Sequence, residues 1–281
     1  MKDSDLHTHS LYSDGELSPS SVVKLARSRG IKNLALTDHN SVEGVNEAIK
    51  EGERIGVSVI PGIEIRAEED EVLGYFIDYE NKEFKKEIES IQNNLINRVK
   101  KIIVKLNKLG IKVSFKDLLK KYNPNKNFME IHLIKYLESM GLGKRRDLWK
   151  KFISESGETF VPIKEISVVE VVKLIRKYGG VPVLAHPWVE PSSKKLLEDE
   201  NFQKLIDAGL LGIELDNGDR DERRDKRTVR RIKQLAKKYN LIVTSGSDFH
   251  IESGGKGDDK MSKHNCSNKV VNRLVEAKQS L

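Results

Sequence analysis

The feature that most constrains the fold of this chain of 281 residues is a regular alternation of two kinds of segment. Short apolar runs rich in Val, Ile and Leu alternate with amphipathic stretches in which apolar residues recur every three or four positions. Such an alternation of strands and helices is typical of βα units built around a parallel sheet. The sequence therefore predicts an α/β protein, and its length suits one barrel-sized domain that carries an insertion.

One segment departs from this alternation. From residue 81 to residue 159 the apolar positions follow helical spacing, first in a long stretch from Phe84 to Leu109, and no strand-like run interrupts them. We therefore expect a barrel domain made of residues 1–80 and 160–281. Residues 81–159 are expected to form a helical insertion that acts as a cap.

The positive charge of the chain belongs mainly to the same segment. Residues 81–160 hold 19 Lys and Arg against 9 Asp and Glu, whereas the net charge of the whole chain is +7. A basic segment beside an acidic site suits a phosphorylated small molecule, a nucleotide or a short single-stranded nucleic acid. Lysine-rich helix faces are also common where a helix is simply solvated, so charge alone leaves both interpretations open.

Composition limits the cofactor and the location. A hydrophobic fraction of 37% and a charged fraction of 33% are ordinary for a globular protein, and no apolar run approaches the roughly 20 residues that span a bilayer. The first residues resemble a strand rather than a signal peptide, so we expect a cytoplasmic protein. With Cys266 as the single cysteine, a cysteine-rich zinc site is excluded, and any metal must rest on imidazole and carboxylate groups.

Such groups stand where strands are expected to end. In DLHTHS, His7 and His9 are two residues apart on a strand, so both rings point to the same face. An H-x-H pair alone is weak evidence for a metal. Asp14 lies in the loop just after this strand, and other residues of ligand type follow the later apolar runs: Asp38, His39, Glu64, His186, Asp248 and His250. Because the carboxyl ends of parallel barrel strands gather on one face, these side chains are expected to converge on one pocket.

The order of these motifs resembles a known family. DLHTHS with SDG, then TDH, PGIE, AHP and SDFH, is similar to the PHP (polymerase and histidinol phosphatase) family of phosphoesterases. The resemblance covers residues 1–76 and 180–250 and implies a distorted (β/α)7 barrel with up to three metals. By the same resemblance, the first metal is held by His7, His9, Glu64 and Asp248. Glu64 bridges to a second metal that His186 also holds, and Asp14, His39 and His250 hold a third.

One position departs from the family pattern. Many relatives have a His three residues before the Gly of the fourth strand, but this chain reads EVLG and places Glu71 there. A carboxylate is a harder ligand than imidazole and favours manganese or magnesium over zinc. We therefore expect two or three divalent ions, with manganese first and zinc, iron or magnesium as alternatives. A solvated Glu71 that binds no metal remains an alternative.

Two residues are candidates for contact with the substrate. His132, in the segment MEIHLIKYLES, resembles a His that relatives bring over the metals to touch the phosphate, although their Arg two residues earlier is Glu130 here. Arg66, just past Glu64, is the second candidate. Either could instead be a packing residue or the partner in an ordinary salt bridge. Asp38 is expected to orient ligands rather than to bind a metal.

These observations predict a hydrolase that acts on phosphate esters by metal-activated water. His7, His9, Glu64 and Asp248, the ligands of the first metal, are expected to support catalysis. The helical insertion resembles that of members acting on nucleotides, nucleoside bisphosphates or short RNA ends. Three alternatives stay open: a histidinol-phosphate phosphatase, an amidohydrolase, and a nucleic-acid-binding module whose site is catalytically silent.

Overall fold

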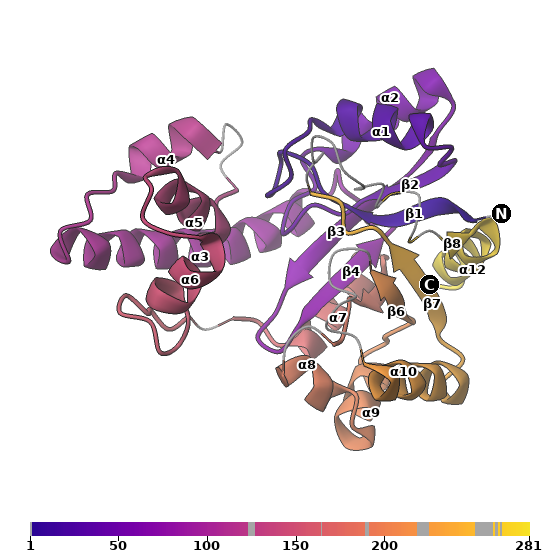
Figure 1. The fold of residues 1–281 in the computed structure, drawn as a ribbon. Coiled ribbons are helices and arrows are strands. Elements are labelled where there is room, and N and C mark those ends of the chain that lie inside the picture. Colours follow the sequence, from indigo (N-terminus) through magenta and orange to yellow (C-terminus); the bar gives the residue numbers. More distant parts are fainter. Residues whose placement is uncertain are drawn as a thin grey trace. The chain divides into compact units, whose positions relative to one another are not determined.

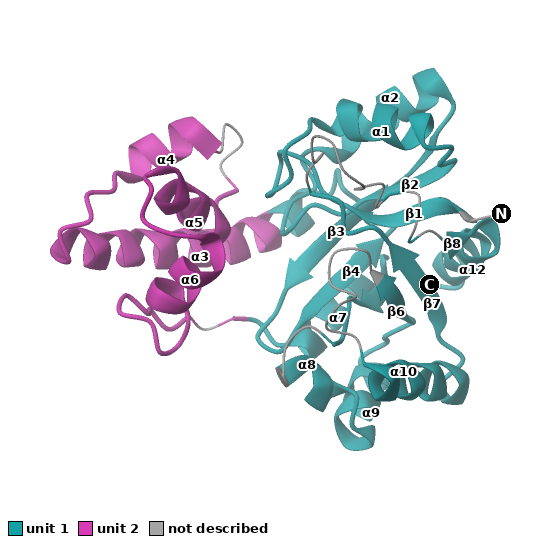
Figure 2. Ribbon diagram, in the orientation of Figure 1, with its two compact units in different colours: residues 1–85, 166–281 teal, residues 86–165 magenta. Residues whose placement is uncertain are grey.

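A computed structural model describes residues 2–122, 127–163, 165–188, 191–217, 225–250, 261, 264 and 266–281. It divides into two compact units (Figure 2). Unit 1 comprises residues 1–85 and 166–281, and unit 2 comprises residues 86–165. Within the described ranges, no helix has both the length and the apolar character needed to cross a membrane.

Unit 1 is built on a mixed sheet of eight strands in the order β7-β6-β5-β4-β3-β2-β1-β8 (Figure 1). The strands are β1 (Lys2–Thr8), β2 (Asn33–Leu36), β3 (Ser58–Arg66), β4 (Glu71–Tyr75), β5 (Val181–Leu184), β6 (Gly212–Asn217), β7 (Ile242–Gly246) and β8 (Cys266–Ser267). The segment after β7 also pairs with β1, because the His9 amide donates to the Phe249 carbonyl oxygen at 2.9 Å. The sheet is thus nearly closed into a barrel, which confirms the predicted fold class.

One detail of the barrel departs from the expected seven strands, and a second concerns strand direction. β8 is an eighth strand that pairs antiparallel with β1, and β4 runs antiparallel to both of its neighbours. The direction of β4 follows from its connection to β3. Only residues 67–70 separate these strands, and a parallel crossover needs a dozen residues or more, so the chain must turn back as a hairpin.

The helices that the structure describes in unit 1 lie on the outside of the sheet, and two of them begin at side chains that cap the helix. They are α1 (Pro19–Ser28), α2 (Val45–Ile55), α7 (Val168–Lys177), α8 (Pro191–Leu196), α9 (Asp199–Asp207), α10 (Lys226–Lys238) and α12 (Asn268–Gln279). Ser18 caps α1 by accepting the Ser21 amide, and Ser167 and Glu170 form a capping box on α7. Two apolar clusters fill the unit, one around Leu6, Ala35 and Leu73 and one around Val22, Leu34 and Ala48.

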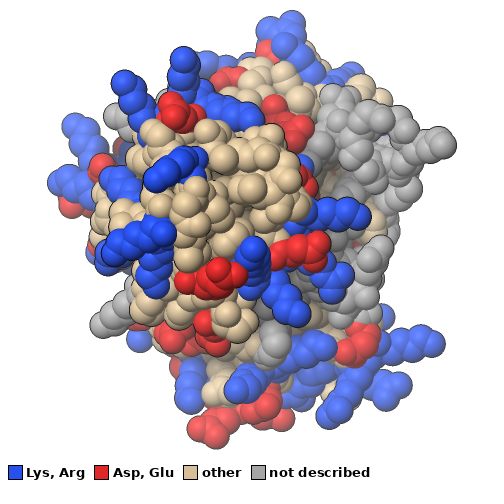
Figure 3. All heavy atoms as spheres, turned by 60° about the vertical axis from the view of Figure 1, so that its left-hand side comes forward, with Lys and Arg blue, Asp and Glu red and all other residues tan. Residues whose placement is uncertain are grey.

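The described part of unit 2 is helical. The long α3 (Lys82–Lys108) begins in unit 1, and α4 (Phe115–Tyr122), α5 (Glu130–Ser139), α6 (Arg145–Leu148) and the π-helix η1 (Trp149–Ile153) follow. Val99, Ile102, Leu106, Leu133 and Leu137 belong to its own buried core. In the face drawn in Figure 3, blue Lys and Arg side chains are spread around a largely tan centre, with red Asp and Glu side chains among them. The role of the insertion as a cap stays a prediction.

Candidate metal centre

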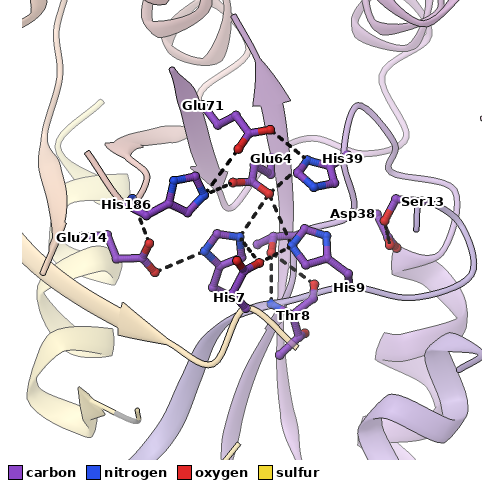
Figure 4. Close-up of polar contacts among 12 residues, drawn as sticks. His7, Thr8, His9, Ser13, Asp38, His39, Glu64, Glu71, His186 and Glu214 are labelled. Carbon is purple, nitrogen blue, oxygen red and sulfur yellow. Dashed lines mark hydrogen bonds and ion pairs between the residues drawn. The ribbon is translucent and has the colours of Figure 1, made fainter. Parts of the chain in front are cut away.

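Glu64, near the end of β3, lies at the centre of a cluster of imidazoles (Figure 4). Its side chain is fully buried. The Glu64 Oε2 atom lies 3.1 Å from His7 Nε2, 3.3 Å from His9 Nε2 and 3.1 Å from His39 Nδ1. The Glu64 Oε1 atom lies 3.0 Å from His186 Nε2. One carboxylate therefore faces imidazoles from the ends of β1, β2 and β5 at once.

The first of three donor groups joins β1 to the end of β7. His7, His9, Glu64 and Asp248 each offer one atom within 4.8 Å of the others, and all four are buried. The Asp248 Oδ1 atom lies 3.1 Å from His9 Nε2 and 3.4 Å from His7 Nε2. Because alternate residues of a strand share a face, β1 presents both imidazoles to the same carboxylates. These are the four residues expected around the first metal.

The second donor group lies beside the first and shares His9 with it. It consists of His9, Asp14, His39 and His250. The Asp14 Oδ1 atom lies 3.1 Å from His250 Nε2 and 3.9 Å from His39 Nε2. The His9 ring stacks on the other two imidazoles, with ring centroids 4.2 Å from His250 and 4.5 Å from His39. The structure thus brings together the three residues expected around the third metal and adds His9 to them.

The third donor group contains Glu71, the residue that departs from the family pattern. Its members are His39, Glu64 and Glu71. The Glu71 carboxylate lies with one oxygen 3.5 Å from His39 Nδ1 and the other 3.4 Å from His186 Nε2. Because β4 is antiparallel, its first residue, rather than its last, stands at this edge of the barrel. Glu71 is therefore directed into the cluster, as Figure 4 shows.

Backbone strain and close packing accompany the cluster. His186 and Asp248 have positive φ angles of 21° and 51°, in a region that side chains with a Cβ rarely occupy. Strained backbone of this kind collects at functional sites, where the surrounding structure enforces it. A Cβ atom on Gly246 would lie 2.3 Å from the Cβ of His7. Only glycine therefore lets β7 approach β1 closely enough for Asp248 to meet the two β1 imidazoles.

A second layer of carboxylates stands behind the imidazoles. Glu214, fully buried on β6, has its Oε1 atom 3.2 Å from His7 Nδ1, and its Oε2 atom accepts the His186 amide at 3.0 Å. The Asp70 Oδ1 atom lies 3.9 Å from His186 Nδ1. A carboxylate hydrogen-bonded to a ligating imidazole, as Glu214 is to His7, fixes the tautomer and orientation of that ring. Neither was anticipated, although Glu214 is an acidic residue flanked by Ile213 and Leu215 in β6, which is a signal that could have been used.

Asp38 holds the loop that follows β1. Its Oδ1 atom accepts the Ser10 amide at 2.7 Å and the Ser13 hydroxyl at 2.6 Å, and its Oδ2 atom accepts the Ser10 hydroxyl at 2.6 Å. Burial raises the pKa of Asp38, and these hydrogen bonds oppose that rise. The side chain is thereby committed to the loop that carries Asp14. It belongs to none of the three donor groups formed by the described residues.

The cluster keeps two of its carboxylates ionised. Burial would raise the pKa of Glu64, but the charges of His7 and His39 outweigh burial and hold that pKa well below its ordinary value. For Asp14, burial acts in the same direction, and His250 and His39 again hold the pKa well below the usual range. Ionised carboxylate is the form that binds a metal.

The imidazoles of the cluster differ from one another in the direction in which their pKa is shifted. Burial, followed by repulsion from His250 and His39, lowers the pKa of His9 to about 3, so this ring is neutral and ready to coordinate. Burial also acts to lower the pKa of His7, but Glu64, Glu214 and Asp248 raise it well above 6.5. For His250 burial is outweighed by Asp14 and Asp248, which raise the pKa to about 10. A metal that binds these last two rings must therefore displace protons.

The donor set fits divalent ions. Imidazole nitrogens and carboxylate oxygens are the ligands that manganese, iron and zinc accept. Adjacent groups share Glu64 or His9, so the chain is suited to hold ions side by side. The residues present therefore fit a cluster of metals, although they do not by themselves identify the element.

A comparison with known proteins decides the family. The model of the PHP domain matches residues 5–145, half of the chain. The chain belongs to the PHP domain family.

Three curated relatives match this PHP protein over nearly its whole length. A 5'-3' exoribonuclease of Haemophilus influenzae is 27% identical over 89% of this chain and 90% of its own. A 3',5'-nucleoside bisphosphate phosphatase of Chromobacterium violaceum is 27% identical over 92% of this chain and 90% of its own. A phosphoribosyl 1,2-cyclic phosphate 1,2-diphosphodiesterase of Eggerthella lenta is 29% identical over 89% of this chain and 95% of its own.

A solved structure agrees with the same assignment. A Bifidobacterium adolescentis protein, proposed to be a metal-dependent phosphoesterase, superposes on this PHP protein with a TM-score of 0.86. It is 25% identical, and the match covers 98% of this chain and 96% of the other. The predicted family and the predicted class of enzyme, a hydrolase acting on phosphate esters, are both confirmed.

The two substrate-binding candidates of the PHP protein have different surroundings. Arg66 is half-buried at the end of β3, and its amide donates to Asn40 Oδ1 at 3.2 Å. His132 is buried in unit 2, where its Nδ1 atom accepts the Met129 amide at 3.1 Å and its ring packs 4.9 Å from that of Phe128. Capping and packing thus account for much of the His132 environment. Contact of either residue with a phosphate stays a prediction.

The remaining His and the single Cys lie apart from the donor groups. His264 has its Nδ1 atom 3.0 Å from Asp216 Oδ1. Cys266 is a buried residue of β8, with its Sγ atom 3.6 Å from the Ser4 carbonyl oxygen, and burial raises the pKa of its thiol to about 12. Neither residue belongs to a donor group in the described part of the chain.

Proposed function

We propose that this PHP protein hydrolyses a phosphate ester of a nucleoside bisphosphate, a nucleotide or a short RNA end, with two or three divalent ions held by its cluster. The observation that carries the proposal is the position of Glu64, one carboxylate shared by imidazoles from three strand ends. A shared carboxylate is a suitable bridge between neighbouring ions.

Three ions have proposed sites in the cluster. The first ion is held by His7, His9, Glu64 and Asp248, and the third by Asp14, His39 and His250. The second is held by Glu64, Glu71 and His186. When bound, the ions supply positive charge for the phosphoryl oxygens and lower the pKa of the attacking water. With Glu71 in place of an imidazole, the site of the second ion favours manganese, with zinc, iron or magnesium as alternatives.

The protein itself contributes orientation. Glu214 accepts a hydrogen bond from His7 Nδ1, which leaves His7 Nε2 directed at Glu64 and Asp248. The loop held by Asp38 carries Asp14 to its two imidazoles. Arg66 is the proposed phosphate contact from the barrel, because it follows Glu64 by two residues on the same strand. The proposed contact from the insertion is His132.

The names of the relatives support the substrate class and also define its rivals. Two relatives act on a nucleoside bisphosphate and on RNA, and a third acts on a cyclic phosphate. A cyclic phosphate carries its ester within a ring, so hydrolysis of it alone would replace the proposed substrates with those of a cyclic phosphodiesterase. Hydrolysis of histidinol phosphate, hydrolysis of an amide and binding of nucleic acid without catalysis also compete with the proposal. A cytoplasmic location stays a prediction.

The test is a substrate panel assayed with the manganese-loaded protein and with the same protein after chelation by EDTA. The panel contains a nucleoside 3',5'-bisphosphate, a 5'-phosphorylated short RNA, a 1,2-cyclic phosphate, histidinol phosphate and an amide. We expect phosphate release from the first two, lost on chelation and restored by manganese. Faster hydrolysis of histidinol phosphate, or hydrolysis of the amide alone, would overturn the proposal.

A further inference from the structure

Helix α10 of unit 1 is unusually basic. Its 13 residues, KRTVRRIKQLAKK, include seven Lys and Arg and no acidic residue. Thr228, Ile232, Leu235 and Ala236 form its buried side, which packs toward the sheet at β6. Amphipathic packing explains these four positions and leaves the chemistry of the opposite side unexplained.

Four of the cations form a single stripe along that opposite side. Lys226, Arg230, Lys233 and Lys237 are spaced by four, three and four residues, so they lie on one helix face, and all four are exposed. They cover about 16 Å of helix axis at 1.5 Å per residue. Together with Val229 and Gln234, these four residues line one open stretch of the protein surface. We call the four cations the α10 stripe.

Two cations of this helix that lie outside the stripe form salt bridges. Arg231 lies 3.1 Å and Lys238 3.0 Å from oxygens of Asp199. No member of the α10 stripe has an acidic partner among the residues that the structure describes. Like charges one turn apart destabilise a helix, and cations in its first turn oppose the helix dipole. A polyanion laid along the stripe would relieve both effects.

The topology relates the stripe to the metal centre. Glu214 lies on β6, and its carboxylate contacts His7 of the cluster. Helix α10 follows β6 in the chain and packs against it. In a βα unit the helix begins on the carboxyl side of the preceding strand, which is the side of the cluster. The Lys226 end of the stripe is therefore the end nearer the metal centre.

We propose that the α10 stripe binds the phosphate backbone of single-stranded RNA whose end is in the metal centre. This inference rests on the proposed function. With about 3.4 Å of axis per phosphate in one strand, the stripe can meet at most about five phosphates. An anionic membrane is the less suitable partner, because membrane-binding helices present an apolar face, and the apolar side of α10 is turned to the barrel.

The test compares two double charge reversals. Arg230→Glu/Lys233→Glu alters the stripe, and Lys50→Glu/Lys173→Glu alters exposed lysines on α2 and α7 by the same net charge. Binding of a fluorescent 2'-O-methyl phosphorothioate RNA of 12 nucleotides, which resists hydrolysis, is measured by anisotropy at several salt concentrations with the manganese-loaded proteins. Thermal melting confirms that both variants are folded.

We expect the stripe variant to bind this RNA at least about tenfold more weakly and to reduce the salt slope by about 1.4, the value for two phosphate contacts. The stripe variant should also lose more kcat/KM for short RNA than for a nucleoside bisphosphate, by the same factor of about ten. Equal effects of the two variants, or no effect of either, would overturn the inference. A stripe variant that binds phosphatidylserine vesicles more weakly but binds the RNA as the wild-type protein does would also overturn the inference. If the wild-type protein hydrolyses neither substrate, the proposed function fails, while anisotropy still decides the role of the stripe.

Discussion

The two units bury charge in different ways. In unit 2, Arg98 and Glu130 form a buried pair with Nη1 and Oε1 2.7 Å apart, and Arg98 Nε also donates to the Val161 carbonyl oxygen at 2.9 Å. In unit 1, four carboxylates meet five imidazoles at the barrel edge: Asp14, Glu64, Glu71 and Asp248 with His7, His9, His39, His186 and His250.

The difference lies in how each arrangement is neutralised. The Arg98 guanidinium is always charged, so the pair in unit 2 compensates itself and serves the packing of the helices. The cluster relies on imidazoles, and His9 is neutral because burial and its neighbours lower its pKa to about 3. The carboxylates of the cluster can be neutralised by metal ions that bind from solution. This property distinguishes a candidate site from a structural ion pair.

The largest expected effect breaks the structural pair. Arg98→Ala leaves the Glu130 carboxylate buried without this cation and should destabilise unit 2 by about 3–5 kcal/mol. Hydrogen exchange of the α5 amides measures the change. The double variant Arg98→Met/Glu130→Leu removes both charges and should regain most of the stability. A loss below about 1 kcal/mol in the single variant would show that the pair is not what neutralises Glu130.

The next effect breaks the cluster. Asp248→Ala and His39→Ala should each lower kcat for the accepted phosphate ester by at least about a hundredfold, because each removes a group proposed to hold a metal. Steady-state kinetics with saturating manganese measures the loss. Asp207→Ala, which removes an exposed carboxylate on α9, is the matched control and should change little. Full turnover in a folded Asp248 variant would remove that residue from the mechanism.

A smaller effect tests the second layer. Glu214→Gln keeps the shape of the side chain but weakens its hold on His7 Nδ1, and should lower manganese affinity by about 10–100-fold. Calorimetric titration of the metal-free protein measures it. Asp216→Asn, on the same strand but facing His264, is the control. Equal losses in both variants would point to net charge instead of orientation.

The smallest effect concerns metal preference. Glu71→His replaces an oxygen donor with a nitrogen donor beside Glu64 and His186 and should shift the ratio of zinc to manganese affinity toward zinc, by about tenfold or less. Competition between the two metals, followed by elemental analysis, measures the ratio. An unchanged ratio would place Glu71 outside the metal shell and favour its solvated alternative.

The sequence predicted that these side chains would converge, and two local rules were enough for that prediction. A strand period of two placed His7 and His9 on one face, and the βα alternation placed His39, His186 and Asp248 at strand ends. It did not foresee the role of Glu214, because an acidic residue between two apolar neighbours signals a polar role without indicating which partner it meets. Nor did the helical pattern around His132 indicate that this ring caps its own helix.

By itself the sequence determined the types of donor, their order along the chain and the periods of the elements that carry them, since these depend only on neighbouring residues. Only the tertiary structure decided that Glu64 is shared, because its contact with His186 joins residues 122 positions apart. The same holds for Glu71, which reaches the cluster because a short hairpin reverses β4. Which strands become neighbours, and in which direction, depends on loop length and barrel closure, and these set the distances between groups that local patterns cannot relate.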